Sequence, residues 1–164
     1  MLASGVLRAV RIDESGLGSP SAARREEWRL AAAELVEDHS FALEPPFELE
    51  LAVSDDGAAL RCIVEGGDAV ALALEHALLA PHLDEYLGVC RTLARLDEEG
   101  AASPRLEALD MAKKVAHDRA AQMLVARLAP LAPDHRTARR IFTLLVTLLF
   151  DTTSLASLRA HRAR

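Results

Sequence analysis

Polar and apolar positions alternate without interruption over residues 47–53, which is the period of a strand with one buried face. Glu48 and Glu50 fall on the face predicted to be exposed. The opposite face carries the side chains predicted to point inward: Phe47, Leu49, Leu51 and Val53. A slip of one residue would reverse both faces, so this pattern also predicts the register of the strand.

Two turn signals follow this strand and divide the next apolar runs. Asp55-Asp56-Gly57 precedes the run 60–64, and Gly66-Gly67-Asp68 precedes the run 70–74. Consecutive short strands joined by tight turns predict an antiparallel β-meander. Residues 69–75 are rich in Ala and Leu, so the choice between strand and helix stays open there. The short β-prone run 6–12 is a further candidate strand, so we expect a meander of three or four strands.

Apolar residues at spacings of three and four predict about four helices. The first spans 22–38, after an N-cap at Ser19 or Ser21, and the second begins at Pro81 and ends near Gly100. The last two span about 103–128 and 134–150, with Pro130 and Pro133 between them. We therefore expect an α+β fold, a small antiparallel meander packed against these helices, with a C-terminal helical hairpin.

The last helix is apolar nearly all round over residues 141–150, which is more than one core-facing stripe requires. Two explanations remain open, a central buried helix or a helix shared across a homodimer interface. We expect residues 1–150 to form a single domain. Residues 151–164 are expected to form a flexible basic tail.

Charge and composition narrow the class of protein. The net charge of −6 argues against nonspecific nucleic-acid binding, which normally needs a strongly basic face. Cys62 and Cys90 form neither a CxxC motif nor a disulfide framework, so both are expected to be buried thiols. The longest apolar run, 141–150, is about half of the ~20 residues that a membrane helix needs. No secretory signal is recognisable, and we expect a cytoplasmic protein without a membrane partner.

The long third helix carries the first group of candidate site residues. Offsets of three, four and seven place one set of side chains on a common face: Asp110, Lys113, Lys114 and His117. Asp110–Lys114 and Lys114–Asp118 stand at i, i+4, as in a solvated face with salt bridges. The alternative is a site that binds an anion or a partner's carboxylate, in which His117 supplies a group that titrates near neutral pH.

The first turns of the last helix carry the second group. Arg136, Arg139 and Arg140 lie close to a helix N-terminus, whose free amides attract anions. Arginine is unfavourable to the helix dipole there, so either an acidic residue of the chain or a phosphate-bearing or acidic ligand should compensate. Thr143 lies one turn further on. If the hairpin packs antiparallel, a polar seam forms from His117, Asp118, Arg140 and Thr143, with Arg136 at its open end.

No complete catalytic constellation is found, and we predict no catalytic residues, no metal and no cofactor. The chain lacks a P-loop, a GxGxxG motif after a strand and a GxSxG elbow. His82, His117-Asp118 and Asp151 follow the order H…HD…D of all-helical metal-dependent phosphohydrolases, but strands precede the helices here. We therefore favour a non-enzymatic binding or regulatory protein, with an unknown protein or an anionic small molecule as partner. The alternative is a small hydrolase acting on a phosphorylated substrate.

Several short stretches together resemble an uncharacterised family of short proteobacterial proteins, over residues 6–150. The resemblance is carried by Ile12-Asp13-Glu14, His39-Ser40-Phe41, Leu109-Asp110-Met111 with Lys113, Lys114 and His117, and the run 137–144 (TARRIFTL). The family usually has two arginines at the positions of Lys113 and Lys114, and His-Asn where this chain has His117-Asp118. No activity is established for the family, so the resemblance implies no mechanism.

Overall fold

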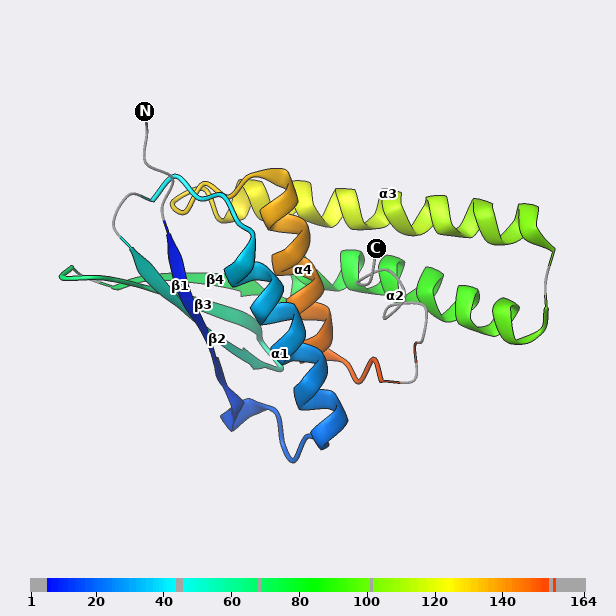
Figure 1. Ribbon diagram of the computed structural model, residues 1–164, viewed down its shortest axis with the longest axis horizontal. Helices are drawn as coiled ribbons and strands as arrows, with labels where there is room; N and C mark the ends of the chain where they lie inside the picture. Colours follow the sequence, from blue (N-terminus) through cyan, green and yellow to red (C-terminus); the bar gives the residue numbers. More distant parts are fainter. Residues whose placement is uncertain (1–5, 44–45, 68, 101, 154, 156–164) are drawn as a thin grey trace.

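The protein is an α+β fold in which helices cover one face of a four-stranded sheet (Figure 1). The computed structural model describes residues 6–43, 46–67, 69–100, 102–153 and 155. The elements are β1 (Leu7–Asp13), a short 3₁₀ turn η1 (Glu14–Gly16), α1 (Ala22–Glu37), β2 (Phe47–Ser54), β3 (Gly57–Val64), β4 (Ala69–Glu75), α2 (His76–Glu98), α3 (Ser103–Arg127) and α4 (His135–Leu149).

The sheet is mixed, which corrects the prediction of a purely antiparallel meander. Its strand order is β1-β2-β3-β4, and both the β2–β3 and the β3–β4 pairs are antiparallel, as expected for tight turns. β1 instead pairs parallel with β2. The reason is the connection, because α1 lies between the two strands in sequence and returns the chain to the end from which it started.

The predicted register of β2 is confirmed. Leu49 and Leu51 are 0% and 1% exposed, whereas the side chains of Glu48 and Glu50 remain partly exposed. Leu49 stands opposite Cys62 and Leu51 opposite Leu60 in the next strand, so this face forms a continuous apolar layer beneath the helices. The alternation in the sequence therefore identified the core side of the sheet.

The chain passes from β4 into α2 without a loop. Residues 69–75 are a strand, which settles the choice left open by the sequence. Glu75 ends the strand and is also the N-cap of α2, with extended backbone angles. α2 starts at His76 rather than at Pro81, so the predicted start was wrong. Pro81 lies inside the helix, where its missing N–H costs one of the early helical hydrogen bonds.

α4 occupies the centre of the helical layer, with α1 on one side and α3 on the other (Figure 1). This position accounts for its apolar character, because most side chains from Ile141 to Leu148 are buried against these neighbours. α3 and α4 are joined by a short connection and contact each other, but α4 crosses α3, so the predicted antiparallel packing of these two helices is wrong (Figure 1). The antiparallel helix pair is α2 with α3, which extends away from the sheet (Figure 1).

The connection after α1 fixes the start of α4. The N–H of Ser40 donates to Thr137 Oγ1 at 2.8 Å, and the N–H of Asp134 donates to the carbonyl of Ser40 at 3.1 Å. His39 Nε2 accepts from the N–H of Leu7 at 3.0 Å and so ties the same connection to β1. These bonds hold the first turn of α4 against the end of α1.

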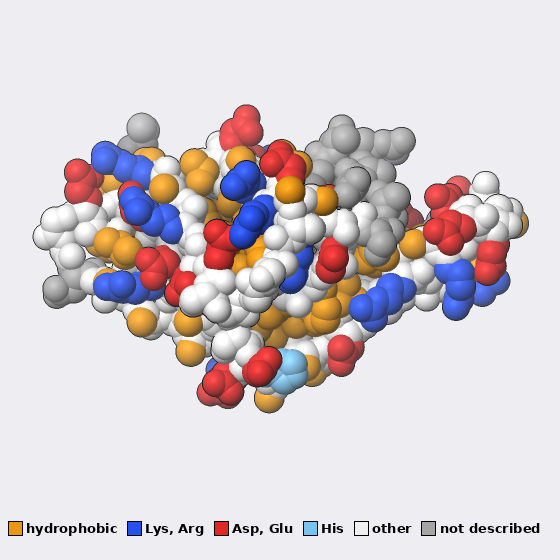
Figure 2. All heavy atoms as spheres, turned by 90° about the horizontal axis from the view of Figure 1, so that it is seen from below, with side chains coloured by type: hydrophobic (Ala, Val, Ile, Leu, Met, Phe, Trp, Pro, Cys, Tyr) orange, Lys and Arg blue, Asp and Glu red, His pale blue; other side chains and the backbone are white. Residues whose placement is uncertain are grey.

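Figure 2 shows basic and acidic side chains interspersed over one face, with hydrophobic side chains gathered in a recess near its middle. None of the helices in the described part of the chain has the length and apolar character that crossing a bilayer requires. Thr152 and Leu155 are buried, so packing continues past Phe150. Residues 156–164 of the predicted tail lie outside the described residues.

Candidate functional site at the crossing of α3 and α4

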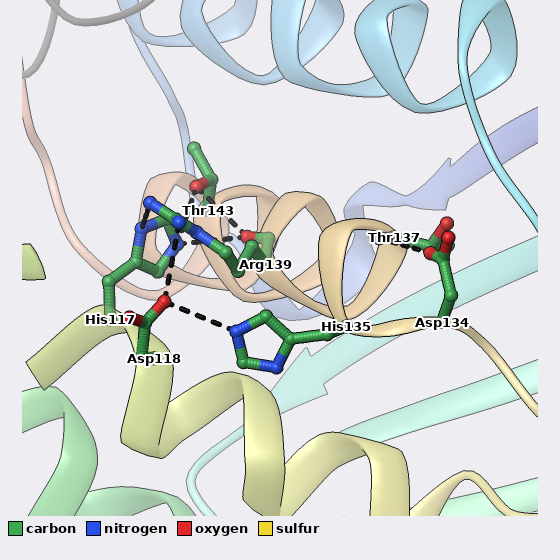
Figure 3. A network of polar contacts seen from close by, with 7 residues as sticks. All are labelled: His117, Asp118, Asp134, His135, Thr137, Arg139 and Thr143. Carbon is green, nitrogen blue, oxygen red and sulfur yellow. Dashed lines mark hydrogen bonds and ion pairs between the residues drawn. The ribbon is translucent and has the colours of Figure 1, made fainter. Parts of the chain in front are cut away.

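Five polar side chains meet where α4 crosses α3, and we call them the α3–α4 polar cluster (Figure 3). Its members are His117, Asp118, His135, Arg139 and Thr143. Asp134 determines where α4 begins, because its side chain accepts from the N–H of Thr137 at 2.8 Å and caps the helix. The cap places the arginines of α4 in its first two turns.

His117 is held between two aromatic rings and the backbone of α4. Its ring centroid lies 5.3 Å from that of Tyr86 and 5.6 Å from that of Phe142. Its Nε2 lies 3.0 Å from the carbonyl oxygen of Arg139 and 3.2 Å from Thr143 Oγ1. The Thr143 hydroxyl donates to the same carbonyl at 3.1 Å. The imidazole is therefore fixed in position and in orientation.

These contacts define the protonation state of His117. Nε2 carries the hydrogen and donates to the Arg139 carbonyl, while Nδ1 accepts from Arg139 Nη2 at 3.4 Å. The pKa of His117 is lowered from 6.5 to about 4, chiefly by burial and also by the charge of the Arg139 guanidinium. The hydrogen bond to the Arg139 carbonyl and the charge of Asp118 oppose this shift. His117 is thus neutral near pH 7, and the expectation that it titrates there is wrong.

Asp118 bridges Arg139 and His135 at the surface. Its Oδ1 lies 3.2 Å from Arg139 Nη1 and 3.2 Å from His135 Nε2. The hydrogen bond to His135, followed by the charge of Arg139, lowers the pKa of Asp118. All three side chains are accessible, with 39% of Arg139, 44% of Asp118 and 46% of His135 exposed. His135 was not predicted from the sequence, although it directly follows Asp134, the expected cap of the last helix.

Arg136 and Arg140 face the opposite side of α4. Both pair with Asp38 at the end of α1, and the Arg140 Nη2–Asp38 Oδ2 distance is 3.0 Å. Arg140 also donates to the Asp38 carbonyl at 3.2 Å. Arg139 therefore takes the place that the predicted seam gave to Arg140. Successive helical residues are rotated by about 100°, and the steep crossing turns residue 139, not 140, towards α3.

The predicted stripe on α3 is divided between surface and interior. Lys114 Nζ lies 3.6 Å from Asp110 Oδ2, an exposed i, i+4 pair of the expected kind. Lys113 is instead turned inward and is only 5% exposed. Burial lowers the pKa of Lys113, and the same cause raises the pKa of the neighbouring Cys90 thiol. Lys113 thus belongs to the interface of α2 and α3, close to His117.

The residues of the phosphohydrolase-like order take part in different local contacts. Asp151 accepts hydrogen bonds from the N–H and the hydroxyl of Thr153, and His117 is bonded to α4 as described above. Over the described ranges there is no group of three or more His, Cys, Asp or Glu side chains arranged to hold a metal ion.

The described geometry is that of a small α+β protein in which one carboxylate bridges an accessible arginine and an accessible histidine. Such a site can exchange its own carboxylate for an anionic group of a ligand.

The chain belongs to the uncharacterised protein family UPF0262, whose sequence profile matches residues 4–151. It is 29% identical to a UPF0262 protein of Novosphingobium aromaticivorans over 153 residues, covering 85% of this chain and 93% of that protein. A UPF0262 protein of Paracoccus denitrificans is 32% identical over 154 residues, with 85% and 93% covered. One from Jannaschia sp. is 31% identical over 150 residues, with 86% and 95% covered. No solved structure matches the chain. The names of these bacterial proteins state no activity.

Proposed function

We propose that this protein is a non-enzymatic binding protein and that its α3–α4 polar cluster binds an anionic group, a carboxylate or a phosphate, of a small molecule or a partner protein. The observation that carries the proposal is the position of Asp118, which holds Arg139 and His135 together while all three side chains stay accessible. In this proposal the Asp118 carboxylate marks the place that the anion of the ligand takes.

The surroundings of Arg139 support such an exchange. His117 accepts from the guanidinium through Nδ1 and donates to the backbone of the same residue through Nε2, so Arg139 stays oriented when Asp118 leaves. The Thr143 hydroxyl also donates to the Arg139 carbonyl. The N-terminus of α4 adds a partial positive charge within two turns. Arg136 and Arg140 form a cationic pair around Asp38, and Lys114 adds a charge further along α3.

Inorganic phosphate is the probe that tests this proposal. A ligand at ten times its dissociation constant stabilises the folded state by about 1.4 kcal/mol, which a thermal melt resolves. We expect phosphate to raise the melting temperature of the wild type and to raise that of Asp118→Asn further, because the competing carboxylate is removed. Arg139→Ala should show no phosphate effect. Each variant is compared with itself without phosphate, so changes in intrinsic stability cancel.

Arg91→Ala serves as the matched control, because Arg91 is an exposed arginine on α2 outside the cluster. It should keep the wild-type response to phosphate. An equal phosphate effect in the wild type and in Arg139→Ala would refute the proposal. Release of phosphate from a phosphomonoester would instead support the small hydrolase, the alternative left open by the sequence. We also propose that the protein acts in the cytoplasm, in keeping with its two buried free thiols.

A further inference from the structure

A groove of about 580 Å³ runs between β1 and α1, on the side of the molecule away from the α3–α4 polar cluster. Its walls are largely apolar and include Val10 and Ile12 of β1 with Ala32 and Val36 of α1. Val10 and Ile12 are only partly buried, although they lie on the same sheet face as the fully buried Leu49 and Leu51. The helical layer therefore leaves this border of the core uncovered.

The groove lies beside an open sheet edge. β1 is the first strand of the sheet, and in the described part of the chain it pairs only with β2. Half of the backbone N–H and C=O groups of an edge strand point away from the sheet and can pair with another strand. A purely apolar ligand in the groove would remove these groups from water without bonding them, whereas a strand would satisfy them.

The chain directions of β1 and α1 are opposite, and the midpoints of these two walls lie side by side. Arg25 of α1 bonds Glu14 at one end, with an Nε–Oε1 distance of 2.9 Å, and His39 bonds the N–H of Leu7 at the other. The middle of β1, Val10, is therefore level with the middle of the segment 25–39, next to Ala33. A two-fold axis through this centre would set β1 antiparallel to a second β1, and α1 antiparallel to a second α1.

The exposed face of α1 beside the groove fits this symmetry. Arg29, Ala33 and Glu37 follow one another at intervals of four residues, line the groove and are exposed. The small Ala33 at the centre permits close approach of two helices. When the helix is reversed about Ala33, Arg29 meets Glu37 of the second copy, and the same pair forms again on the other side of the axis. The groove is thus complementary in charge to a reversed copy of itself.

We propose that this surface, the β1–α1 edge, is the interface of a homodimer in which two β1 strands pair antiparallel into one continuous sheet and two α1 helices close the grooves. The second copy is preferred to an unrelated extended peptide because the order of the charges along α1 matches the reversed α1 itself. This interface is distinct from the α4-mediated dimer considered from the sequence, and it does not depend on the anion site.

Sedimentation equilibrium of the full chain tests the proposal through charge exchange. The wild type should be dimeric, and Arg29→Glu and Glu37→Arg should each raise the dimer dissociation constant by about tenfold or more, since each places like charges opposite one another. An equimolar mixture of these two single variants should form a heterodimer at least as tight as the wild type. The double variant Arg29→Glu/Glu37→Arg should return to within about threefold of the wild type.

Arg91→Glu on α2 makes the same charge change away from the edge and should leave the dimer unchanged. Both substituted groove residues are exposed, and circular dichroism verifies that each variant is folded. A wild type that stays monomeric up to about 100 µM would overturn the proposal. So would a dimer that is indifferent to the single substitutions, because its interface would then lie elsewhere. Binding of an extended peptide to the groove of a monomeric chain would also overturn it, by identifying a different occupant.

Discussion

His117 and Arg139 hold each other at two points across the crossing of α3 and α4. The imidazole donates from Nε2 to the Arg139 carbonyl at 3.0 Å, and its Nδ1 accepts from the guanidinium at 3.4 Å. One neutral ring therefore fixes both the backbone and the side chain of the same arginine. A second proton on Nδ1 would point at the guanidinium and break this arrangement.

The first prediction is a loss of stability in mild acid. His117 binds a proton near pH 6.5 in the unfolded chain but only near pH 4 in the folded protein. Between these pH values the unfolded state binds more protons than the folded state, so the free energy of unfolding falls as the pH falls. The neutral ring therefore contributes up to about 3 kcal/mol to the free energy of unfolding above pH 6.5, and this contribution is lost as the pH falls towards 4. Urea unfolding at pH 7 and pH 4.5 measures this difference.

His117→Asn is the matched variant for this measurement, because it lacks the titrating group. Its free energy of unfolding should be lower at pH 7 and should change less between the two pH values. The lowered pKa values of Asp118 and Asp134 act below their usual value of 3.8, outside this window. Identical pH dependence in the wild type and in His117→Asn would contradict the prediction.

The second prediction ranks two arginines that share one carboxylate. Arg140→Ala should lower the free energy of unfolding by about 1 kcal/mol, because Arg140 binds both the side chain and the carbonyl of Asp38 and its side chain is only 25% exposed. Arg136→Ala should cost less than about 0.5 kcal/mol, since its side chain is 69% exposed. Thermal melts of the two variants, recorded side by side, give the ranking. A larger loss for Arg136→Ala would show that Asp38 supports α4 mainly through its exposed partner.

The third prediction concerns the hydrogen bond that positions α4. Thr137 is 1% exposed, and its hydroxyl oxygen accepts from the N–H of Ser40 at 2.8 Å. Thr137→Val keeps the shape but leaves this amide without an acceptor, and it should lower the free energy of unfolding by about 1–3 kcal/mol. Thr92→Val is the control, because the Thr92 hydroxyl donates to the Gly88 carbonyl of its own helix. Equal losses in the two variants would refute the special role of Thr137.

The fourth prediction concerns the two thiols. Burial raises the pKa of Cys62 to about 11 and raises that of Cys90 as well, so neither forms a thiolate readily. Reaction with a thiol reagent at pH 8 should be slow for the folded protein and fast after unfolding in urea. Rapid labelling of one thiol in the folded protein would reveal an opening of the core at that position.

Features that depend on local periodicity were predicted correctly from the sequence. Features that depend on how the helices and strands are placed relative to one another were not. The alternation over residues 47–53 reported the buried face of β2, because inside and outside alternate with each residue. The same alternation contains no information on strand direction, so the parallel pairing of β1 was missed. Pro81 indicates a helix start because proline favours the first turn of a helix, but α2 begins at His76 and contains Pro81 despite the lost hydrogen bond.

The candidate site shows the same division. The histidine and aspartate of α3 and the arginines of α4 were identified by residue type and spacing. Which arginine meets His117 depends on the crossing angle of the two helices, and that angle is set by side-chain volumes over the whole interface. The assumption of an antiparallel hairpin therefore exchanged Arg139 for Arg140.

The central position of α4 affects how the protein is made on the ribosome. The faces of α1 and α3 that cover this helix are both synthesised before it, and α4 lies between them in the folded protein. In a nascent chain that ends before residue 135, the apolar faces of α1 and α3 that pack on α4 remain exposed to solvent. Folding of the helical layer is thus postponed until α4 has been synthesised, and products that terminate before it become substrates for chaperones and proteases.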